Sequence, residues 1–154
     1  VGNGISGAVA RRLVDLGVTA VDVAGAGGTS WSEVEAHRQK DPAARRVAHT
    51  FAGWGIPTAT ALRDVRTALP DLPVFASGGI RSGIDAAKAV RLGASLVGIA
   101  APALGNAMET AAAVKGDMSE MIEELRIAMF CTGSKDLSEL KSAVLRHVSD
   151  GTVL

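Results

Sequence analysis

The sequence predicts an α/β fold in which helices alternate with short parallel strands and cover them. Three observations predict it: apolar stripes at helical spacing that end in Leu-Gly, runs of apolar and β-branched residues that follow them, and small residues where those runs end. The predicted strands are residues 18–24, 74–77 and 95–100. Strands that are apolar on both faces and separated by helices are typical of a parallel sheet covered by helices.

Capping residues mark where the predicted helices begin and end. Ser6 can cap the first helix, and Gly17 can end it. A second helix is expected from about Pro57, because proline is favoured in the first helical turn. Ser82 and Asp85 are spaced as a capping box at the start of a third.

The last third of the chain is predicted to be helical, over residues 118–132 and 136–147. An apolar stripe on the first of these helices is more typical of core packing than of cofactor contact. Its members are Met118, Met121, Ile122, Leu125 and Met129. Residues 37–52 are polar and basic, and we expect them to be mobile. We take residues 1–154 as a single partial domain.

Composition favours a globular protein of the cytoplasm. Apolar residues make up 47% of the 154 residues, and sixteen basic residues balance sixteen acidic ones, so neither nucleic acid nor a membrane is expected as a partner. No apolar run approaches the ~20 residues of a membrane span, and the first residues lack signal-peptide features. The single cysteine, Cys131, excludes an internal disulfide and is expected to be a buried structural thiol.

The stretch SGGIRSGIDAAKAV, which starts at Ser77, predicts an anion site. Glycines before a helix expose backbone N–H groups, and here those of Gly78, Gly79 and Ile80 could converge on a phosphate. The Arg81 guanidinium offers a fork for phosphate oxygens. From this motif alone, Arg81 could equally pair with a surface carboxylate.

The stretch AGAGGTSWSEVE predicts a second ligand-facing loop. Its adjacent glycines let the chain pass close to a bulky ligand, and Thr29 adds a hydroxyl. Trp31 and Glu35 are four residues apart and would share a helix face, where the carboxylate could move a proton or bind a metal-held water. A half-buried tryptophan and a solvated glutamate are the alternative. The three histidines lack metal-ligand spacing, so we expect no metal ligand in this chain.

Five stretches together resemble the type 2 isopentenyl diphosphate isomerases. They are VGNGIS, DVAGAGGTSWSEVE, WGIPTA, SGGIRSGIDAAKAVRLGA and TGSKDLSEL, in that order, from Val1 to about Leu140. The resemblance implies the C-terminal part of a (β/α)8 (TIM) barrel that binds FMN, Mg²⁺ and NADPH. It also implies a homo-oligomeric enzyme that interconverts isopentenyl and dimethylallyl diphosphate, with reduced FMN as acid and base.

The same resemblance implies roles for eight residues. Two would be catalytic and lie over the substrate, and six would bind the cofactor, five of them at the FMN phosphate and Thr29 at the flavin. The catalytic pair is Trp31 and Glu35; the cofactor-binding residues are Thr29, Gly79, Ile80, Arg81, Ala100 and Ala101. The family's flavin-contacting lysine and metal-binding glutamate would lie upstream of Val1, and Ala24 replaces a serine that some members use near the flavin.

Two other functions stay open from the sequence. An α-hydroxy acid oxidase is a related FMN barrel, but its catalytic histidine is absent from the corresponding loop, GAGGTSW. A non-catalytic module that binds a phosphorylated ligand through Arg81 and its glycines is the second.

Overall fold

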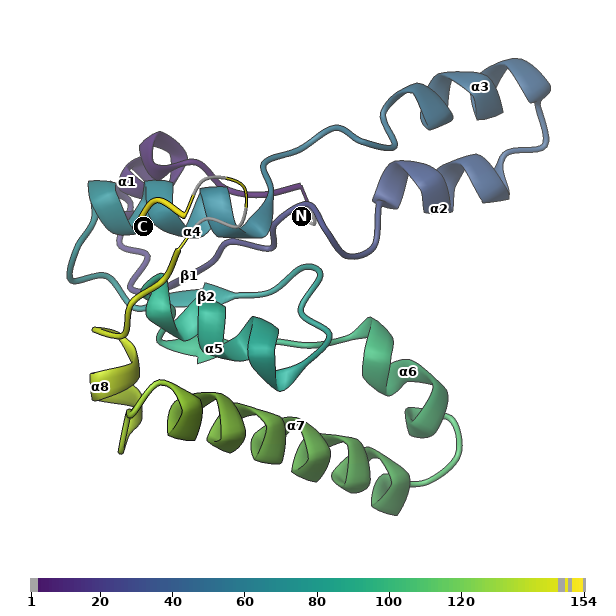
Figure 1. The fold of residues 1–154 in the computed structure, drawn as a ribbon. Helices are drawn as coiled ribbons and strands as arrows, with labels where there is room; N and C mark the ends of the chain where they lie inside the picture. The colour runs from purple at the N-terminus through teal and green to yellow at the C-terminus, as the bar shows by residue number, and fades with distance from the viewer. Residues whose placement is uncertain (1–2, 147–148, 150, 154) are drawn as a thin grey trace.

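The computed structural model describes residues 3–146, 149 and 151–153, and within them three parallel strands form one sheet (Figure 1). The strands lie in the order β1 (Val21–Asp22), β2 (Val74–Ala76) and β3 (Leu96–Val97). Val21 pairs with Val74, and Phe75 pairs with Leu96. The predicted α/β class is confirmed.

Each strand is shorter than predicted, but the backbone pairing continues toward the carboxyl ends. The Gly25 amide donates to Ser77 O at 2.9 Å, and the Gly98 amide donates to Ala76 O at 2.9 Å. The small residues at the strand ends therefore belong to the paired part of the sheet. This pairing holds the loops that follow the strands side by side.

Eight helices are present in the described part of the chain. They are α1 (Gly7–Asp15), α2 (Trp31–Arg38), α3 (Pro42–Thr50), α4 (Thr58–Ala68), α5 (Gly83–Arg91), α6 (Ala101–Ala107), α7 (Ala111–Cys131) and α8 (Leu137–Leu140). The predicted caps are confirmed: Ser6 Oγ accepts from the Val9 amide, and Ser82 Oγ accepts from the Asp85 amide. Helix α4 follows Pro57 as expected.

The main core lies between the sheet and its neighbouring helices. Helix α1 packs beside α4, which contacts β2, while α5 contacts β3 and packs on α7 (Figure 1). Buried side chains from both strands and helices form the cluster. They are Ala10, Val21, Val23, Ala61, Leu62, Val65, Val74, Ala76, Ile80, Ala89 and Ala94. Small residues dominate, so the helices approach the sheet closely.

The two C-terminal helices differ from their predicted ranges of 118–132 and 136–147. Helix α7 begins at Ala111, because Thr110 caps it and an alanine-rich turn with high helix propensity extends it ahead of the apolar stripe. Helix α8 ends at Leu140. After Leu140 the chain leaves the helical path, because Ala143 O accepts a hydrogen bond from Arg91 Nε at the end of α5. Residues 147 and 148 lie outside the described part.

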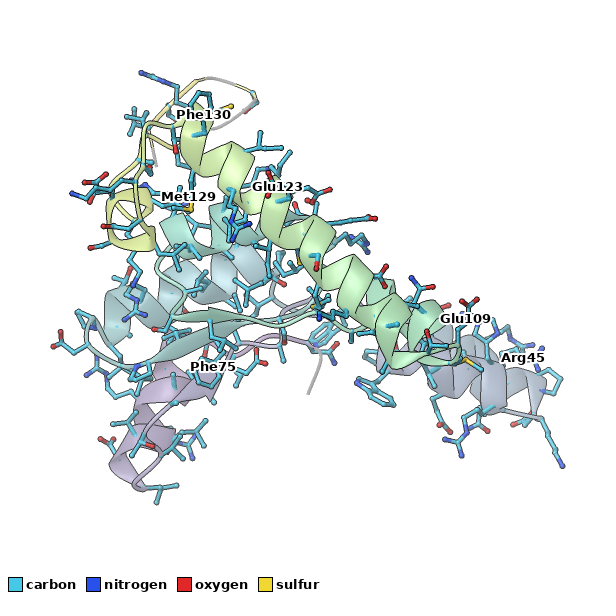
Figure 2. All side chains as sticks on the ribbon, turned by 90° about the horizontal axis from the view of Figure 1, so that it is seen from below. Arg45, Phe75, Glu109, Glu123, Met129 and Phe130 are labelled. Carbon is cyan, nitrogen blue, oxygen red and sulfur yellow. The ribbon has the colours of Figure 1, made fainter. Side chains whose placement is uncertain are left out.

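The stripe on α7 packs as predicted at Leu125 and Met129, while Met118 and Met121 are half-buried. Both Leu125 and Met129 pack against a second cluster formed by buried residues of α5 and by Leu140, and Met129 is labelled in Figure 2. Ile122 is 49% exposed. The prediction for Cys131 is wrong: its side chain is exposed, as is that of neighbouring Phe130, whereas it is Met129 of the same turn that packs against the second cluster.

The segment from 37 to 52 contains helix α3, which forms a hairpin with α2 that stands away from the sheet (Figure 1). Asp41 caps α3 by accepting from the Ala43 and Ala44 amides, and Pro42 opens it. His49 Nδ1 lies 2.8 Å from Glu33 Oε1 and joins the two helices. The expected mobility of this segment stays a prediction.

Candidate functional site

A cavity of about 420 Å³ lies at the carboxyl ends of the three strands. In parallel α/β folds, ligands bind at this end of the sheet. The loops after β1, β2 and β3 all contribute to the lining. Seven of the eight residues predicted for the site line it: Thr29, Trp31, Gly79, Ile80, Arg81, Ala100 and Ala101. The structure thus brings together residues that are up to 72 positions apart in the chain.

Glu35 is the exception among the predicted site residues. It lies one turn beyond Trp31 on α2, is exposed, and accepts a hydrogen bond from Gln39 Nε2. It is absent from the cavity lining within the described residues. Trp31 itself is 56% exposed at the cavity edge. The helix therefore carries the indole to the cavity and the carboxylate farther out.

Two glycine loops cross backbone to backbone beside the cavity. Gly78 has φ +95°, and a Cβ placed there would lie 2.0 Å from Gly25 O. A Cβ on Gly28 would lie 2.9 Å from Gly79 N. Any side chain at these positions would push the loops apart. The glycines are therefore needed for the packing of β1's loop on β2's loop.

The backbone amides in the β2 loop provide hydrogen-bond donors for an anion. Within the described residues, the N–H groups of Gly78, Gly79 and Ile80 have no acceptor. Consecutive amides of this kind form the anion-binding concavities known as nests. This loop carries the predicted phosphate-binding stretch.

The start of α5 is less available than the sequence suggests. Asp85 Oδ2 accepts from the Arg81 amide at 3.1 Å, and Glu124 Oε2 of α7 accepts from the Gly83 amide at 2.5 Å. Glu124 thus already satisfies the first amide of this helix, and Asp85 satisfies the amide just before its N-cap, so two carboxylates lie at the helix start. An anion in the cavity would be bound by the loop amides rather than by the helix terminus.

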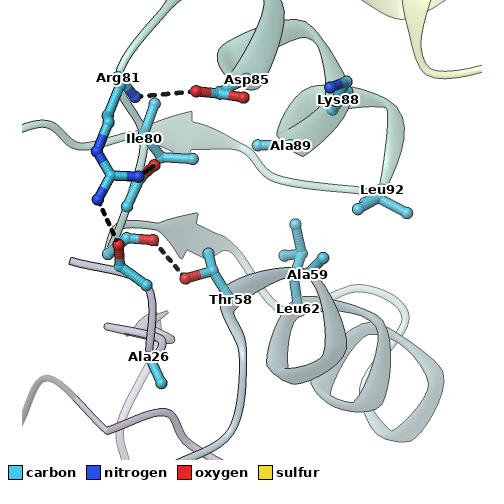
Figure 3. A pocket seen from close by; sticks show the side chains of 13 residues that line it. Ala26, Thr58, Ala59, Leu62, Ile80, Arg81, Asp85, Lys88, Ala89 and Leu92 are labelled. Atoms are coloured by element: carbon cyan, nitrogen blue, oxygen red, sulfur yellow. Dashed lines mark hydrogen bonds between the residues drawn. The ribbon is translucent and has the colours of Figure 1, made fainter. Parts of the chain in front are cut away.

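Arg81 bridges the two loops in Figure 3. Its guanidinium donates to Gly27 O at 2.9 Å and to Gly79 O at 3.3 Å. No described carboxylate lies within salt-bridge distance of the guanidinium. The alternative in which Arg81 pairs with a surface carboxylate is therefore not what the structure shows. Its positive charge is available to an anionic ligand.

A smaller cavity of about 240 Å³ adjoins the first, between α4 and α5 (Figure 3). Thr58 at the start of α4 donates its hydroxyl to Gly78 O, which secures the loop from this side. Apolar side chains of Leu62, Ala89 and Leu92 line the deeper part. This arrangement supports the loop that carries the free amides.

Sequence reasoning assigned no site role to Asp22 or Ser77, which also line the main cavity. Ser77 Oγ donates to Asp22 Oδ1 at 2.8 Å, and the Ala24 amide donates to the same oxygen at 2.9 Å. Ala24 has φ +40°, a left-handed conformation. The Asp22 carboxylate stabilises this conformation by accepting from the Ala24 amide. Asp22 stands out in the sequence only as a charged residue inside an apolar strand.

Metal and membrane features are absent from the described part of the chain. No three histidine, cysteine, aspartate or glutamate side chains there are arranged to hold a metal ion. None of the described helices is both long enough and apolar enough to cross a membrane.

Comparison with known proteins identifies the family. The model of the FMN-dependent dehydrogenases matches residues 5–147. The chain belongs to this family. Membership in this family agrees with the expected fold, a partial α/β barrel. Solved structures agree with it as well. A lactate oxidase from Pediococcus acidilactici has a TM-score of 0.69 and 26% identity over 92% of this chain and 34% of its own.

Two further comparisons bear on the ligand and the reaction. A mandelate oxidase solved with an FMN adduct has a TM-score of 0.65 and 25% identity, over 90% of this chain and 38% of its own. Isopentenyl-diphosphate delta-isomerases are more similar in sequence: that of Stutzerimonas stutzeri is 59% identical over 97% of this chain, and that of Pseudescherichia vulneris is 55% identical over 97%. The chain covers 43% of each, so it spans less than half the length of these relatives. The resemblance read from the motifs is confirmed.

Proposed function

We propose that this chain forms the FMN-phosphate side of an enzyme that interconverts isopentenyl diphosphate and dimethylallyl diphosphate. One observation carries the proposal: the chain is 55–59% identical to two isopentenyl-diphosphate delta-isomerases but 25–26% identical to the two oxidases of similar fold. The GAGGTSW loop supports it, because this loop lacks the histidine that an α-hydroxy acid oxidase uses.

The chemistry of the cavity fits FMN. The amides of Gly79 and Ile80 and the guanidinium of Arg81 would bind the phosphate, with Ala100 and Ala101 closing the site from the β3 loop. Small residues at these positions let a ligand approach the backbone.

The remaining predicted site residues would face the flavin and the substrate. Thr29 would donate its hydroxyl to the flavin, and Trp31 would shield the substrate from water. Glu35 would assist at the substrate diphosphate or its metal once the hairpin of α2 and α3 packs over the site. Reduced FMN supplies the acid and base that act at the substrate's double bond.

The remaining requirements come from the resemblance, except the cytoplasmic location, which comes from composition. They are Mg²⁺ to neutralise the substrate diphosphate, NADPH to reduce the flavin, a homo-oligomeric assembly, and a cytoplasmic location. The metal ligands and a flavin-contacting lysine would be contributed by the part of the enzyme upstream of Val1. This chain would then act only as part of a completed barrel, which we define as the chain fused to the remaining part of the Stutzerimonas stutzeri relative.

A substrate panel tests the proposal. The completed barrel, with FMN, Mg²⁺ and NADPH, is given isopentenyl diphosphate, lactate or mandelate, and the products are measured by NMR. We expect dimethylallyl diphosphate and no oxidation of either hydroxy acid. Oxidation without isomerisation would favour an oxidase, and flavin binding without any turnover would favour a non-catalytic module.

Glu35→Gln in the completed barrel tests the role of the α2 carboxylate. Since Glu35 is outside the cavity lining, we expect FMN affinity within twofold of the parent and turnover reduced about tenfold to a hundredfold, as for loss of a charged group that acts at the substrate diphosphate or its metal. Glu123→Gln is the control, because Glu123 is an exposed carboxylate on α7. A variant that lost FMN but kept its activity per bound flavin would contradict this role.

A further inference from the structure

Asp22 projects toward the cavity rather than into the core. Its neighbours in the chain, Val21 and Val23, are 5% and 0% exposed and belong to the main core. Side chains alternate between the two faces of a strand, so Asp22 lies on the opposite face. That face lines the 420 Å³ cavity, where the Asp22 side chain is accessible.

The two carboxylate oxygens of Asp22 have different roles. Oδ1 accepts from Ser77 Oγ and from the Ala24 amide, which fixes the orientation of the carboxylate. Oδ2 has no hydrogen-bond donor among the described residues, and no lysine or arginine there pairs with Asp22. The cavity therefore contains an oriented carboxylate oxygen that can accept another hydrogen bond.

The negative charge of Asp22 restricts which part of a ligand can lie beside it. A carboxylate repels phosphate, so the phosphate belongs with Arg81 and the free loop amides. Asp22 needs a ligand group that donates a hydrogen bond without carrying negative charge. In FMN, hydroxyls of the ribityl chain lie between the phosphate and the ring, and a hydroxyl is such a donor.

We propose that Asp22, oriented by Ser77, binds a ribityl hydroxyl of FMN and thereby sets which end of the cofactor faces the substrate. The inference rests on the proposed use of FMN and gives a role to Asp22, the first residue of the motif DVAGAGGTSWSEVE, that neither the motif nor the comparisons assign. It assigns the cavity two unlike ends, with phosphate bound at Arg81 and the polyol bound at Asp22.

The affinities of the Asp22→Asn variant for three flavins test whether Asp22 binds the ribityl chain. Asp22→Asn keeps the Oδ1 acceptor for Ser77 and Ala24 but turns the free oxygen into a donor. In the completed barrel, fluorescence titration should show FMN and riboflavin binding about tenfold more weakly, the effect of losing one hydrogen bond to a charged group. Binding of lumiflavin, which has no ribityl chain, should stay within twofold. Equal weakening of all three flavins, or no weakening of any, would overturn the proposal.

Controls separate a local effect from misfolding. Asp15→Asn, at the exposed end of α1, should leave all three affinities unchanged. If Asp22→Asn does not fold, Ser77→Ala takes its place: it keeps the carboxylate and removes one group that orients it. We expect about threefold weaker FMN and riboflavin binding and unchanged lumiflavin binding; unchanged binding of all three would overturn the proposal. A parent barrel that bound no flavin would refute the proposed function, and this inference with it.

Discussion

Gly78→Ala should destabilise the completed barrel by about 3–5 kcal/mol, the range of severe core substitutions. The left-handed φ of +95° is the smaller cause, since alanine pays about 1–2 kcal/mol there. The larger cause is steric, because the new Cβ would lie 2.0 Å from Gly25 O, in a backbone that is itself hydrogen-bonded to Ser77. Neither loop can move without breaking the pairing of β1 with β2.

Gly17→Ala is the matched control. Gly17 has nearly the same φ, +94°, but nothing within 4 Å of the position that a Cβ would take. We expect a loss of about 1–2 kcal/mol, the backbone cost alone. Denaturant unfolding followed by circular dichroism gives both values. Equal losses for the two variants would show that the crossing of the glycine loops contributes nothing to stability.

Arg81→Ala should weaken FMN binding by about tenfold to a hundredfold, as expected for a lost charge-assisted hydrogen bond. The guanidinium has no carboxylate partner among the described residues, so its removal takes away charge that the phosphate would use. Riboflavin, which lacks the phosphate, should lose less than threefold. Fluorescence titration of both flavins gives the comparison.

Two further variants define what Arg81 contributes. Arg81→Lys keeps the charge but not the planar fork that bonds Gly27 O and Gly79 O, so it should recover only part of the affinity. Arg63→Ala, an exposed position on α4, should change neither affinity. Equal weakening of riboflavin and FMN by Arg81→Ala would mean that Arg81 organises the loops and does not bind phosphate.

The sequence predicted those features of the fold that depend on neighbouring residues. Ser6 and Ser82 cap helices because a hydroxyl needs an amide only three positions away, at Val9 and at Asp85. The strand-end glycines and Arg81 were predicted for the site because parallel strands end at one edge of a sheet. The same local reasoning missed α7's first turns, which are rich in alanine and carry no stripe of large apolar side chains.

Features that depend on the pairing of distant segments could not be predicted. The bond from Ser77 to Asp22 joins residues 55 positions apart and follows from the register of β1 on β2. Glu124, which satisfies the start of α5, is 41 positions from Gly83 and reaches it through the packing of α7 on α5. The sequence predicted the Gly78, Gly79 and Ile80 amides for the phosphate, and these have no acceptor among the described residues, but it could not predict that Glu124 already occupies the Gly83 amide of the helix start.

Asn3 and Gly4 lie beside the loop that follows β1. From the sequence we expect Val1 to Gly4 to be the trailing edge of a fourth strand, and residues 1 and 2 lie outside the described part. The Gly4 amide donates to Ala24 O and the Ile56 amide donates to Asn3 O, so this segment runs beside the loop that follows β1. Further strands of a closed barrel would continue the sheet from that edge.

The central claim is that this chain supplies the FMN side of an isomerase whose other side comes from the part upstream. Complementation of the two parts tests this claim most directly. The chain and the remaining part of the Stutzerimonas stutzeri relative are purified separately, and turnover of isopentenyl diphosphate is measured with FMN, Mg²⁺ and NADPH for each part and for the mixture. We expect dimethylallyl diphosphate from the mixture and none from this chain alone, because the three strands of its described residues cannot close a barrel that needs eight. Robust turnover by this chain alone, or none by a mixture that binds FMN, would contradict the account.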